Sequence, residues 1–367
     1  MTLVEISDKL HDRVQAFIAA PDASGESRNQ LALDLARYQA KFNPGYARLV
    51  ERRGSRLECF EEIVAVPSAA FRLARIATHS EGDDVARFVT SGTTGSRRGM
   101  HALRRLDTYR LAALTWGKKA LLVVGQEQAA VACLASPPNG LPSSSLAFMM
   151  NVFVDEFDRD REAQDSAFLL SPAGIDLPRL ERTLDRAKSS GRPLLLLATS
   201  FSLVALLDRL EGQRLRGDGH VVVMQTGGFK GRSREVSADS LRLQVSLALG
   251  TPPEFIVGEY GMTELCSQMY EACLPSGRLY REPGLYLAPP WLHVEAVDPV
   301  SLDPVGPGQT GLARFVDLAN VDSAVCIITE DRIRCHDGGL ELLGRSPGSE
   351  PRGCSLEVEA LVATTER

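Results

Sequence analysis

The chain has 367 residues, 44% of them hydrophobic, and its 41 basic and 47 acidic residues give a formal net charge of −6. A chain of this length and composition can bury a substantial core, and its acidic balance gives no general support for nucleic-acid binding. It contains no run of about 18 apolar residues, so no membrane-spanning helix is expected.

Residues 1–60 show the spacing of amphipathic helices. The apolar residues between positions 31 and 38, for example, recur among charged residues on one helical face. Turn-forming residues at 43–45 and 52–54 interrupt the pattern. We therefore expect residues 1–80 to form an N-terminal helical segment that caps the main domain.

From residue 86 onward, short apolar runs alternate with helix-like stretches, which favours βαβ units around a parallel sheet. The runs are residues 87–89, 129–134, 194–197, 221–223 and 255–257, and the helix-like stretches include 177–188 and 202–210. After Pro290, apolar runs at 292–297, 312–316 and 325–328 follow one another without helices. The predicted fold class is therefore α/β, with parallel βαβ sheet layers and a C-terminal antiparallel β subdomain.

A loop rich in glycines and hydroxyl side chains follows the first of these runs. Its members are Thr90, Ser91, Gly92, Thr93, Thr94 and Gly95, followed by Arg97, Arg98 and Gly99. Glycines let backbone N–H groups approach an anion, while hydroxyl and guanidinium groups add donors and charge, so the loop is a candidate phosphate site. It is not a Walker A motif, because the chain contains no Gly-Lys-Ser or Gly-Lys-Thr. Taken alone, the run is equally compatible with a polar surface turn.

Three further clusters lie downstream. They are Gly227, Gly228 and Phe229 after the run at 221–224; Glu259, Tyr260, Gly261, Thr263 and Glu264 after the run at 254–257; and Asp331 and Arg345 near the end of the chain. The first two fall at the carboxyl ends of predicted strands, where α/β proteins bind ligands. A carboxylate such as Asp331 can accept hydrogen bonds from two vicinal hydroxyls.

Together these motifs resemble the adenylate-forming superfamily, which includes acyl- and aryl-CoA ligases, adenylation domains and relatives of firefly luciferase. The resemblance implies the large-domain fold of that superfamily, with ATP and Mg²⁺ as cofactors. It implies that residues 90–95 surround the β- and γ-phosphates, residues 227–229 lie beside the adenine, Tyr260 stacks on it, Thr263 touches phosphate, Glu264 binds the metal, Asp331 holds the ribose and Arg345 meets phosphate. Such a set suits attack of a carboxylate on the α-phosphorus, because negative charge grows on both reactants.

A narrower resemblance points to one branch, the LuxE acyl-protein synthetases of bacterial luminescence. It is carried by Thr-Gly-Gly-Phe-Lys-Gly-Arg at 226–232, Glu-Tyr-Gly-Met-Thr-Glu-Leu at 259–265, Asp-Leu-Ala-Asn at 317–320, Thr-Glu-Asp at 329–331 and Arg-Gly-Cys-Ser-Leu at 352–356. The middle residue of the Thr-Glu-Asp triplet is glycine in the wider superfamily. The narrower resemblance covers the chain from about residue 66 and implies an enzyme that activates a fatty acid as acyl-AMP, carries the acyl group on Cys354 and passes it to a reductase.

Larger members of the superfamily continue into a mobile domain that bears a catalytic lysine. This chain ends 22 residues after Arg345, and its last lysine is Lys230. We therefore expect a truncated fold, with a catalytic domain at 81–345 and a short tail at 346–367. Arg98, Lys230, Arg232 and Arg345 are the candidates for positive charge at the α-phosphate, and the sequence does not rank them.

Cys354 follows Arg352 and Gly353. A neighbouring guanidinium lowers the pKa of a thiol, and a thiolate forms acyl esters that are easily passed on, so a reactive role is plausible beside the common role of a buried, inert cysteine. The other six cysteines show no Cys-x-x-Cys pair or zinc-finger spacing. They favour a reducing compartment, and we expect the chain to be cytoplasmic.

Two further features bear on substrates. By resemblance, the loop at 137–145 and the apolar residues 146–153, with Met149 and Met150, line the acyl pocket, although composition alone favours a plain core helix. The arginines at 97, 98, 104 and 105 are explained by the phosphates of ATP.

The predicted function is ATP-dependent activation of a carboxylic acid, with fatty acids favoured, and transfer of the acyl group to a protein thiol. The expected partners are that acid and an acyl-accepting protein such as a reductase or a carrier protein. One alternative is an acyl-CoA or aryl-CoA ligase of the phenylacetate type, in which coenzyme A replaces Cys354. Another is a non-catalytic scaffold subunit of an acyl-reductase complex.

Overall fold

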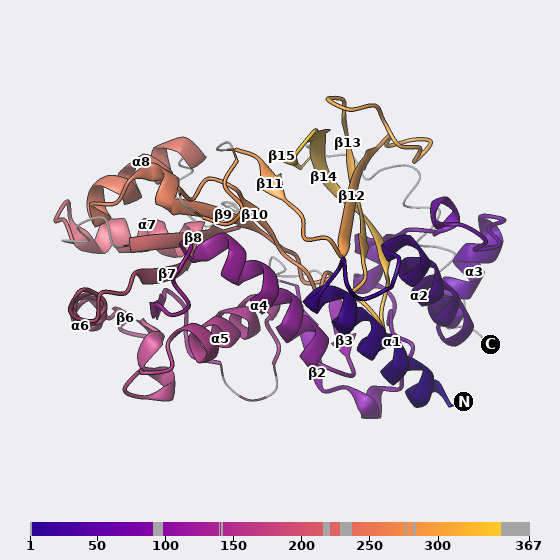
Figure 1. Cartoon of the computed structure of the whole chain (residues 1–367), viewed down its shortest axis with the longest axis horizontal. Helices are drawn as coiled ribbons and strands as arrows, with labels where there is room; N and C mark the ends of the chain where they lie inside the picture. Colours follow the sequence, from indigo (N-terminus) through magenta and orange to yellow (C-terminus); the bar gives the residue numbers. More distant parts are fainter. Residues whose placement is uncertain are drawn as a thin grey trace.

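The computed structural model describes residues 2–90, 98–138, 140, 142–215, 221–227, 237–275, 277–281 and 284–345 (Figure 1). Its helices are α1 (Leu3–Ala19), α2 (Arg28–Phe42), α3 (Pro44–Arg52), α4 (Asp107–Leu121), α5 (Ser145–Phe157), α6 (Leu177–Ser189), α7 (Ser200–Leu210) and α8 (Ala238–Leu249). Its strands are β1 (Val66–Pro67), β2 (Ala86–Val89), β3 (Met100–Leu103), β4 (Ala130–Cys133), β5 (Leu170–Ser171), β6 (Gly174–Ile175), β7 (Leu194–Thr199), β8 (Val221–Thr226), β9 (Ile256–Tyr260), β10 (Met269–Glu271), β11 (Tyr286–Leu287), β12 (Leu292–Val297), β13 (Thr310–Asp317), β14 (Cys326–His336) and β15 (Gly339–Arg345). In the described part of the chain, no helix is long and apolar enough to cross a membrane.

An eleven-stranded sheet runs through the molecule in the order β12-β13-β14-β15-β11-β10-β9-β8-β7-β4, with β1 beside β14. Strands β4, β7, β8 and β9 are parallel, whereas β12 to β15 pair antiparallel. Strands β10 and β11 join the two parts. The α/β fold class with a parallel part and a C-terminal antiparallel part is thus confirmed, and both parts belong to one hydrogen-bonded sheet.

Helices cover both faces of the parallel strands. In β7, Leu195 and Leu197 belong to the large core shared with α4 and α5, while the alternate residues Leu194 and Leu196 pack into a second core with α6, α7 and α8. This alternation follows from the two-residue period of a strand and explains why the strand reads as a continuous apolar run. Figure 1 shows α6, α7 and α8 gathered at one end of the molecule.

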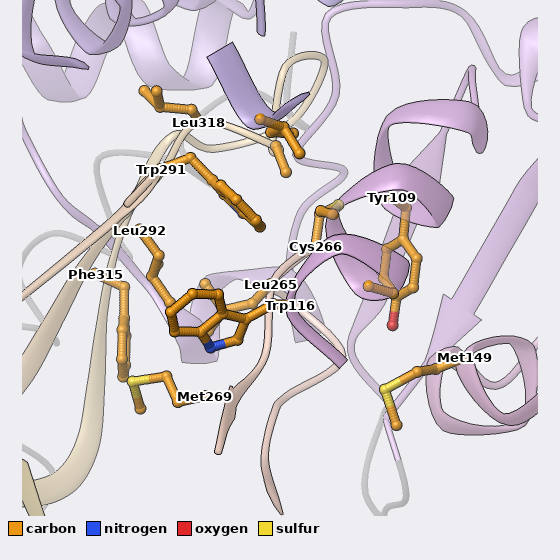
Figure 2. Packing of buried hydrophobic residues seen from close by; sticks show 14 of the residues in the cluster. Tyr109, Trp116, Met149, Leu265, Cys266, Met269, Trp291, Leu292, Phe315 and Leu318 are labelled. Carbon is orange, nitrogen blue, oxygen red and sulfur yellow. The ribbon is translucent and has the colours of Figure 1, made fainter. Parts of the chain in front are cut away.

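The large core also contains the N-terminal helices and the antiparallel strands. The rings of Trp116 and Trp291 meet edge to face at 6.2 Å, and Phe315 and Met269 lie beside them (Figure 2). The helices predicted within residues 1–60 are confirmed as α1, α2 and α3. The buried faces of these helices pack into the same core as the antiparallel strands, so the helices are part of the main domain.

Two expectations are corrected. The run at 87–89 forms β2, which pairs antiparallel with β3 in a separate two-stranded sheet instead of joining the parallel strands. Arg104 donates to Ser7, Asp8 and Asp322, and Arg105 donates to Asp8 and Asp107. These arginines therefore fasten α1 to the start of α4, and phosphate binding is not needed to explain them.

Candidate active site

The carboxyl ends of β8 and β9, where the sequence places two of the nucleotide clusters, lie side by side. Thr226 ends β8 and lies beside Glu259 of β9, and the Thr226 hydroxyl donates a hydrogen bond to the Glu259 carboxylate. Glu259 is only 6% exposed, and burial raises the pKa of its carboxyl to about 7. A Cβ at Gly261 would lie 2.5 Å from Glu259 Oε1, so any side chain there would force the Glu259 carboxylate to shift. The Glu259 carboxylate thus lies close against the backbone of Gly261 at the carboxyl end of β9.

Tyr260 links the parallel strands to the antiparallel ones. Its ring stacks on Phe315 of β13 with centroids 5.8 Å apart, and its hydroxyl donates to Asp331 Oδ2 at 2.7 Å. On the other side of that carboxylate, Arg345 Nε donates to Asp331 Oδ1 at 3.0 Å across the β14–β15 pair. Three predicted site residues from distant parts of the chain therefore form one connected group, and each Asp331 oxygen keeps a further lone pair for another donor.

Thr263 and Glu264 lie in the turn between β9 and β10. His101 of β3 contacts the Thr263 carbonyl at 2.8 Å through Nδ1, which must carry the proton because a carbonyl only accepts. Burial lowers the pKa of His101 to about 4, so the ring is neutral at pH 7. Asn320 donates to the Glu264 carbonyl at 2.9 Å, and the Glu264 side chain is 7% exposed.

The structure describes the predicted phosphate loop only at its two ends. Thr90 and Gly99 exchange two hydrogen bonds, Thr90 N–H to the Gly99 carbonyl and Gly99 N–H to the Thr90 hydroxyl, both at 2.9 Å. Arg98 stands at the exit of the loop and is exposed. The short hairpin of β2 and β3 thus brings the two ends of the predicted loop together.

Several predicted residues lie outside the described ranges. They are Ser91, Gly92, Thr93, Thr94, Gly95, Gly228, Phe229, Lys230, Arg232 and Cys354. Gly227 is described: its φ of 72° lies in the region that favours glycine, and its carbonyl accepts from the Ser200 hydroxyl at 2.5 Å.

A metal site built from protein side chains alone is not found in the part of the chain that the structure describes, where no group of three or more His, Cys, Asp or Glu converges. Magnesium in nucleotide sites is commonly held by one or two carboxylates together with substrate phosphates and waters. A single buried carboxylate at Glu264, with a hydroxyl at Thr263 beside it, fits that donor set.

The helix expected beside the acyl chain is α5. Met149 and Met150 on it are fully buried, and Tyr109 packs against Phe88 and Phe148 with ring centroids 5.4 to 5.6 Å away. Among the described residues this region is tightly packed core, as composition alone favoured. Its place in an acyl pocket stays a prediction.

Of the six described cysteines, Cys133, Cys266, Cys273 and Cys326 are buried, Cys335 is partly buried and Cys59 is exposed. Burial raises the pKa of the Cys266 and Cys273 thiols, which makes them poor nucleophiles. Cys59 is therefore the accessible thiol to control for in labelling experiments.

Some residues of the site carry no clear sequence signal. His101 and Phe315 are single side chains on strands, and their contacts with Thr263 and Tyr260 join segments more than fifty positions apart. Thr226 opens the motif at 226–232, but only the register of β8 on β9 reveals its bond to Glu259. Homologous sequences varying together at such pairs would be the signal that finds them.

Comparison with protein families shows that the profile of the family described as "Acyl-protein synthetase, LuxE" matches residues 22–362. Among curated proteins, the long-chain-fatty-acid--luciferin-component ligase of Vibrio harveyi is 24% identical over 362 residues, spanning 93% of this chain and 91% of its own. The enzyme of the same name from Aliivibrio fischeri is 22% identical and covers 83% of this chain and 80% of its own.

Among solved structures, an open conformation of 2-hydroxyisobutyryl-CoA ligase, in complex with 2-HIB-AMP and CoA, superimposes with a TM-score of 0.61. The two chains are 16% identical, and the match covers 89% of this chain and 71% of the ligase. At that identity the likeness concerns the fold, which is that of adenylate-forming enzymes.

Proposed function

Because the chain belongs to the LuxE family of acyl-protein synthetases, we propose that it uses ATP and Mg²⁺ to activate a fatty acid as acyl-AMP and then transfers the acyl group to a protein thiol. Family membership and the fold make the chain an AMP-forming ligase. The observation that carries the proposal is the connected group of Tyr260, Asp331 and Arg345 next to the turn that holds Glu264. It joins the cluster at 259–264 to Asp331 and Arg345.

The described residues suit the parts of a nucleotide. The half-buried Tyr260 ring has one face against Phe315, and we assign the other face to an adenine base. Asp331 is fixed by two donors and can accept the ribose hydroxyls, and Thr263 and Glu264 offer a hydroxyl and a carboxylate to phosphate and metal. Bound Mg²⁺ would supply charge neutralisation at the phosphates.

In the first half-reaction, a carboxylate oxygen of the acid forms a bond to the α-phosphorus of ATP, and the bond from that phosphorus to the bridging oxygen breaks. Pyrophosphate leaves and acyl-AMP remains. No base is required, because a carboxylic acid is already ionised near neutral pH. The protein's task is to orient the two anions and offset their charge, and we assign this task to residues 81–345, with Arg98 and Lys230 as flanking cations.

In the second half-reaction, a thiolate attacks the acyl carbonyl and AMP leaves. We propose Cys354, in the segment 346–367, as the first acceptor, and an acyl-accepting protein such as a reductase as the next. The relatives' name, which pairs a long-chain fatty acid with a luciferin component, supports both a fatty substrate and a protein acceptor. The six described cysteines are unpaired, which agrees with a cytoplasmic location.

A labelling experiment tests the proposal. Incubation with ATP, Mg²⁺ and a radiolabelled long-chain fatty acid should leave label on the protein that hydroxylamine removes. We expect Cys354→Ser to abolish this labile label and the matched Cys59→Ser variant, which removes the exposed thiol, to retain it. An undiminished labile label in Cys354→Ser would contradict the proposed carrier.

Two measurements made in parallel separate the alternatives. If coenzyme A accepts the acyl group while the protein stays unlabelled, the chain acts as an acyl-CoA ligase. If no acid supports exchange of pyrophosphate into ATP, the non-catalytic scaffold is correct.

A further inference from the structure

We propose that three buried polar residues, His101, Asp317 and Asn320, are positioning residues that hold the turn carrying Thr263 and Glu264 in the geometry needed for the metal–nucleotide complex. We call these three residues the turn clamp. The inference rests on the proposed function, because it concerns the carboxylate assigned there to the metal. Asp317 and Asn320 belong to the Asp-Leu-Ala-Asn motif at 317–320, to which the sequence gives no role in binding, and His101 stands in no motif.

The clamp residues reach the turn from two sides. His101 comes from β3, directly after the predicted phosphate loop, and donates to the Thr263 carbonyl. Asn320 follows β13 and donates to the carbonyls of Glu264 and Ala324, at 2.9 and 3.0 Å. Consecutive peptide groups of the turn are therefore fastened to different parts of the fold.

Asp317, at the end of β13, holds the next part of the turn. Its carboxylate accepts from Cys266 N–H at 2.9 Å and from the Ser267 hydroxyl at 2.7 Å. The Ser267 hydroxyl in turn accepts from Trp291 Nε1 at 3.1 Å. A main-chain bond from Asn320 N–H to the Asp317 carbonyl ties the two clamp residues to each other.

All three clamp residues are fully buried. Their side chains form hydrogen bonds with main-chain atoms of Thr263, Glu264 and Cys266. Such bonds fix the path of the backbone from which the Thr263 and Glu264 side chains project. In a buried setting the loss of one partner leaves the other polar group unsatisfied, so the turn has few alternative positions. A backbone fixed in this way does not have to reorganise when a cation arrives.

A comparison of Mg·ATP binding with AMP binding distinguishes a positioning role of the clamp residues from a role in general stability. By calorimetry we expect Asp317→Asn and Asn320→Asp to weaken binding of Mg·ATP at least about tenfold, whereas binding of AMP without metal changes less than about twofold. AMP probes the adenine and ribose contacts of Tyr260 and Asp331, which the clamp does not touch. The matched control is Asp158→Asn, which changes an equally buried carboxylate on the far side of the parallel strands. It should lower the unfolding temperature and leave the ratio of the two affinities unchanged.

Clamp variants that fold and keep the wild-type ratio of Mg·ATP to AMP affinity would overturn the inference, as would variants that lose both affinities equally. A measurement on the unmodified protein guards against variants that fail to fold. Hydrogen exchange should show the amides of residues 265–267 protected as strongly as the core strands, and rapid exchange there would also refute the clamp. Failure of the proposed function looks different, because the wild-type protein would then bind neither nucleotide.

Discussion

The two carboxylates assigned to the nucleotide, Glu264 and Asp331, lie in contrasting surroundings. Glu264 is 7% exposed on a turn whose backbone is fastened by buried side chains. Asp331 lies at the more open β14–β15 pair, and its partner Arg345 has a side chain that is 56% exposed. If the proposed assignments hold, the contrast makes the proposed metal side of the site rigid before the ligand binds, whereas the proposed ribose side can adjust.

The physical reason is the cost of moving buried polar groups. A turn held by buried hydrogen bonds can shift only if several donors and acceptors lose their partners together. An ion pair near the surface exchanges its partner for water at small cost. The following changes probe this contrast, beginning with the largest effect.

Replacing Glu264 by glutamine should have the largest effect. The change keeps the shape of the side chain and removes its charge, so acyl-AMP formation should fall by about 10²- to 10³-fold. Pyrophosphate release at varied Mg²⁺ concentrations measures it. Glu341→Gln, which alters a surface carboxylate paired with Arg334, serves as the control and should behave as the wild type. If the rate of acyl-AMP formation falls by less than about threefold in Glu264→Gln, Glu264 does not hold the metal.

Acid should loosen the buried turn. His101 has a pKa of about 4 in the folded chain because of its burial, against about 6.5 when unfolded. Below pH 6.5 the unfolded chain takes up a proton that the folded chain refuses, so stability is lost as the pH falls from 6.5 towards 4. At pH 4, this effect of His101 lowers the free energy of unfolding by on the order of 3 kcal/mol.

Urea unfolding of the wild type and of His101→Asn at several pH values measures this term. Asparagine keeps a donor near the position of Nδ1 but does not titrate, so the variant should lose less stability over the same pH range. Equal slopes for the two proteins would show that His101 is not held neutral by the fold.

On the ribose side, Asp331→Asn should weaken ATP binding by about tenfold, because a neutral amide accepts hydroxyl donors less strongly than a carboxylate does. Binding of ATP and 2′-deoxy-ATP to both proteins forms a cycle. The wild type should distinguish the two nucleotides, and the variant should distinguish them much less. If the variant retains the full preference for the ribose hydroxyl, Asp331 is not its partner.

The smallest effect is expected for Arg345→Ala. Because its side chain is largely exposed, loss of the ion pair with Asp331 should change the free energy of unfolding by less than about 1 kcal/mol. Denaturant titration gives this value directly. A loss of several kcal/mol would show that the ribose side is as rigid as the metal side.

Much of the fold was predictable because its signals are local. The apolar run at 194–197 predicted a strand of a parallel sheet, and the amphipathic spacing within residues 1–60 predicted helices there. The pairing of β2 was not, because a short run carries no information on whether its neighbour is parallel or antiparallel. Arg104 misled for a similar reason, since its partner Asp322 lies 218 positions away.

The site divides in the same way. Tyr260, Glu264 and Asp331 stand in short contiguous patterns, so the sequence predicts them as site residues, and the structure joins Tyr260 to Asp331. The clamp residues His101 and Asn320 act through main-chain atoms, which any residue type provides. The sequence therefore picks out the motif at 317–320, which contains Asp317 and Asn320, without indicating that these side chains support the turn.

Exchange of labelled pyrophosphate into ATP tests the central claim most directly. If this edge of the sheet activates a fatty acid, the wild-type protein should catalyse exchange that depends on both Mg²⁺ and a long-chain fatty acid, and Glu264→Gln should nearly abolish it. Absence of exchange with every carboxylic acid tried, or exchange that proceeds equally well in Glu264→Gln, would contradict the account.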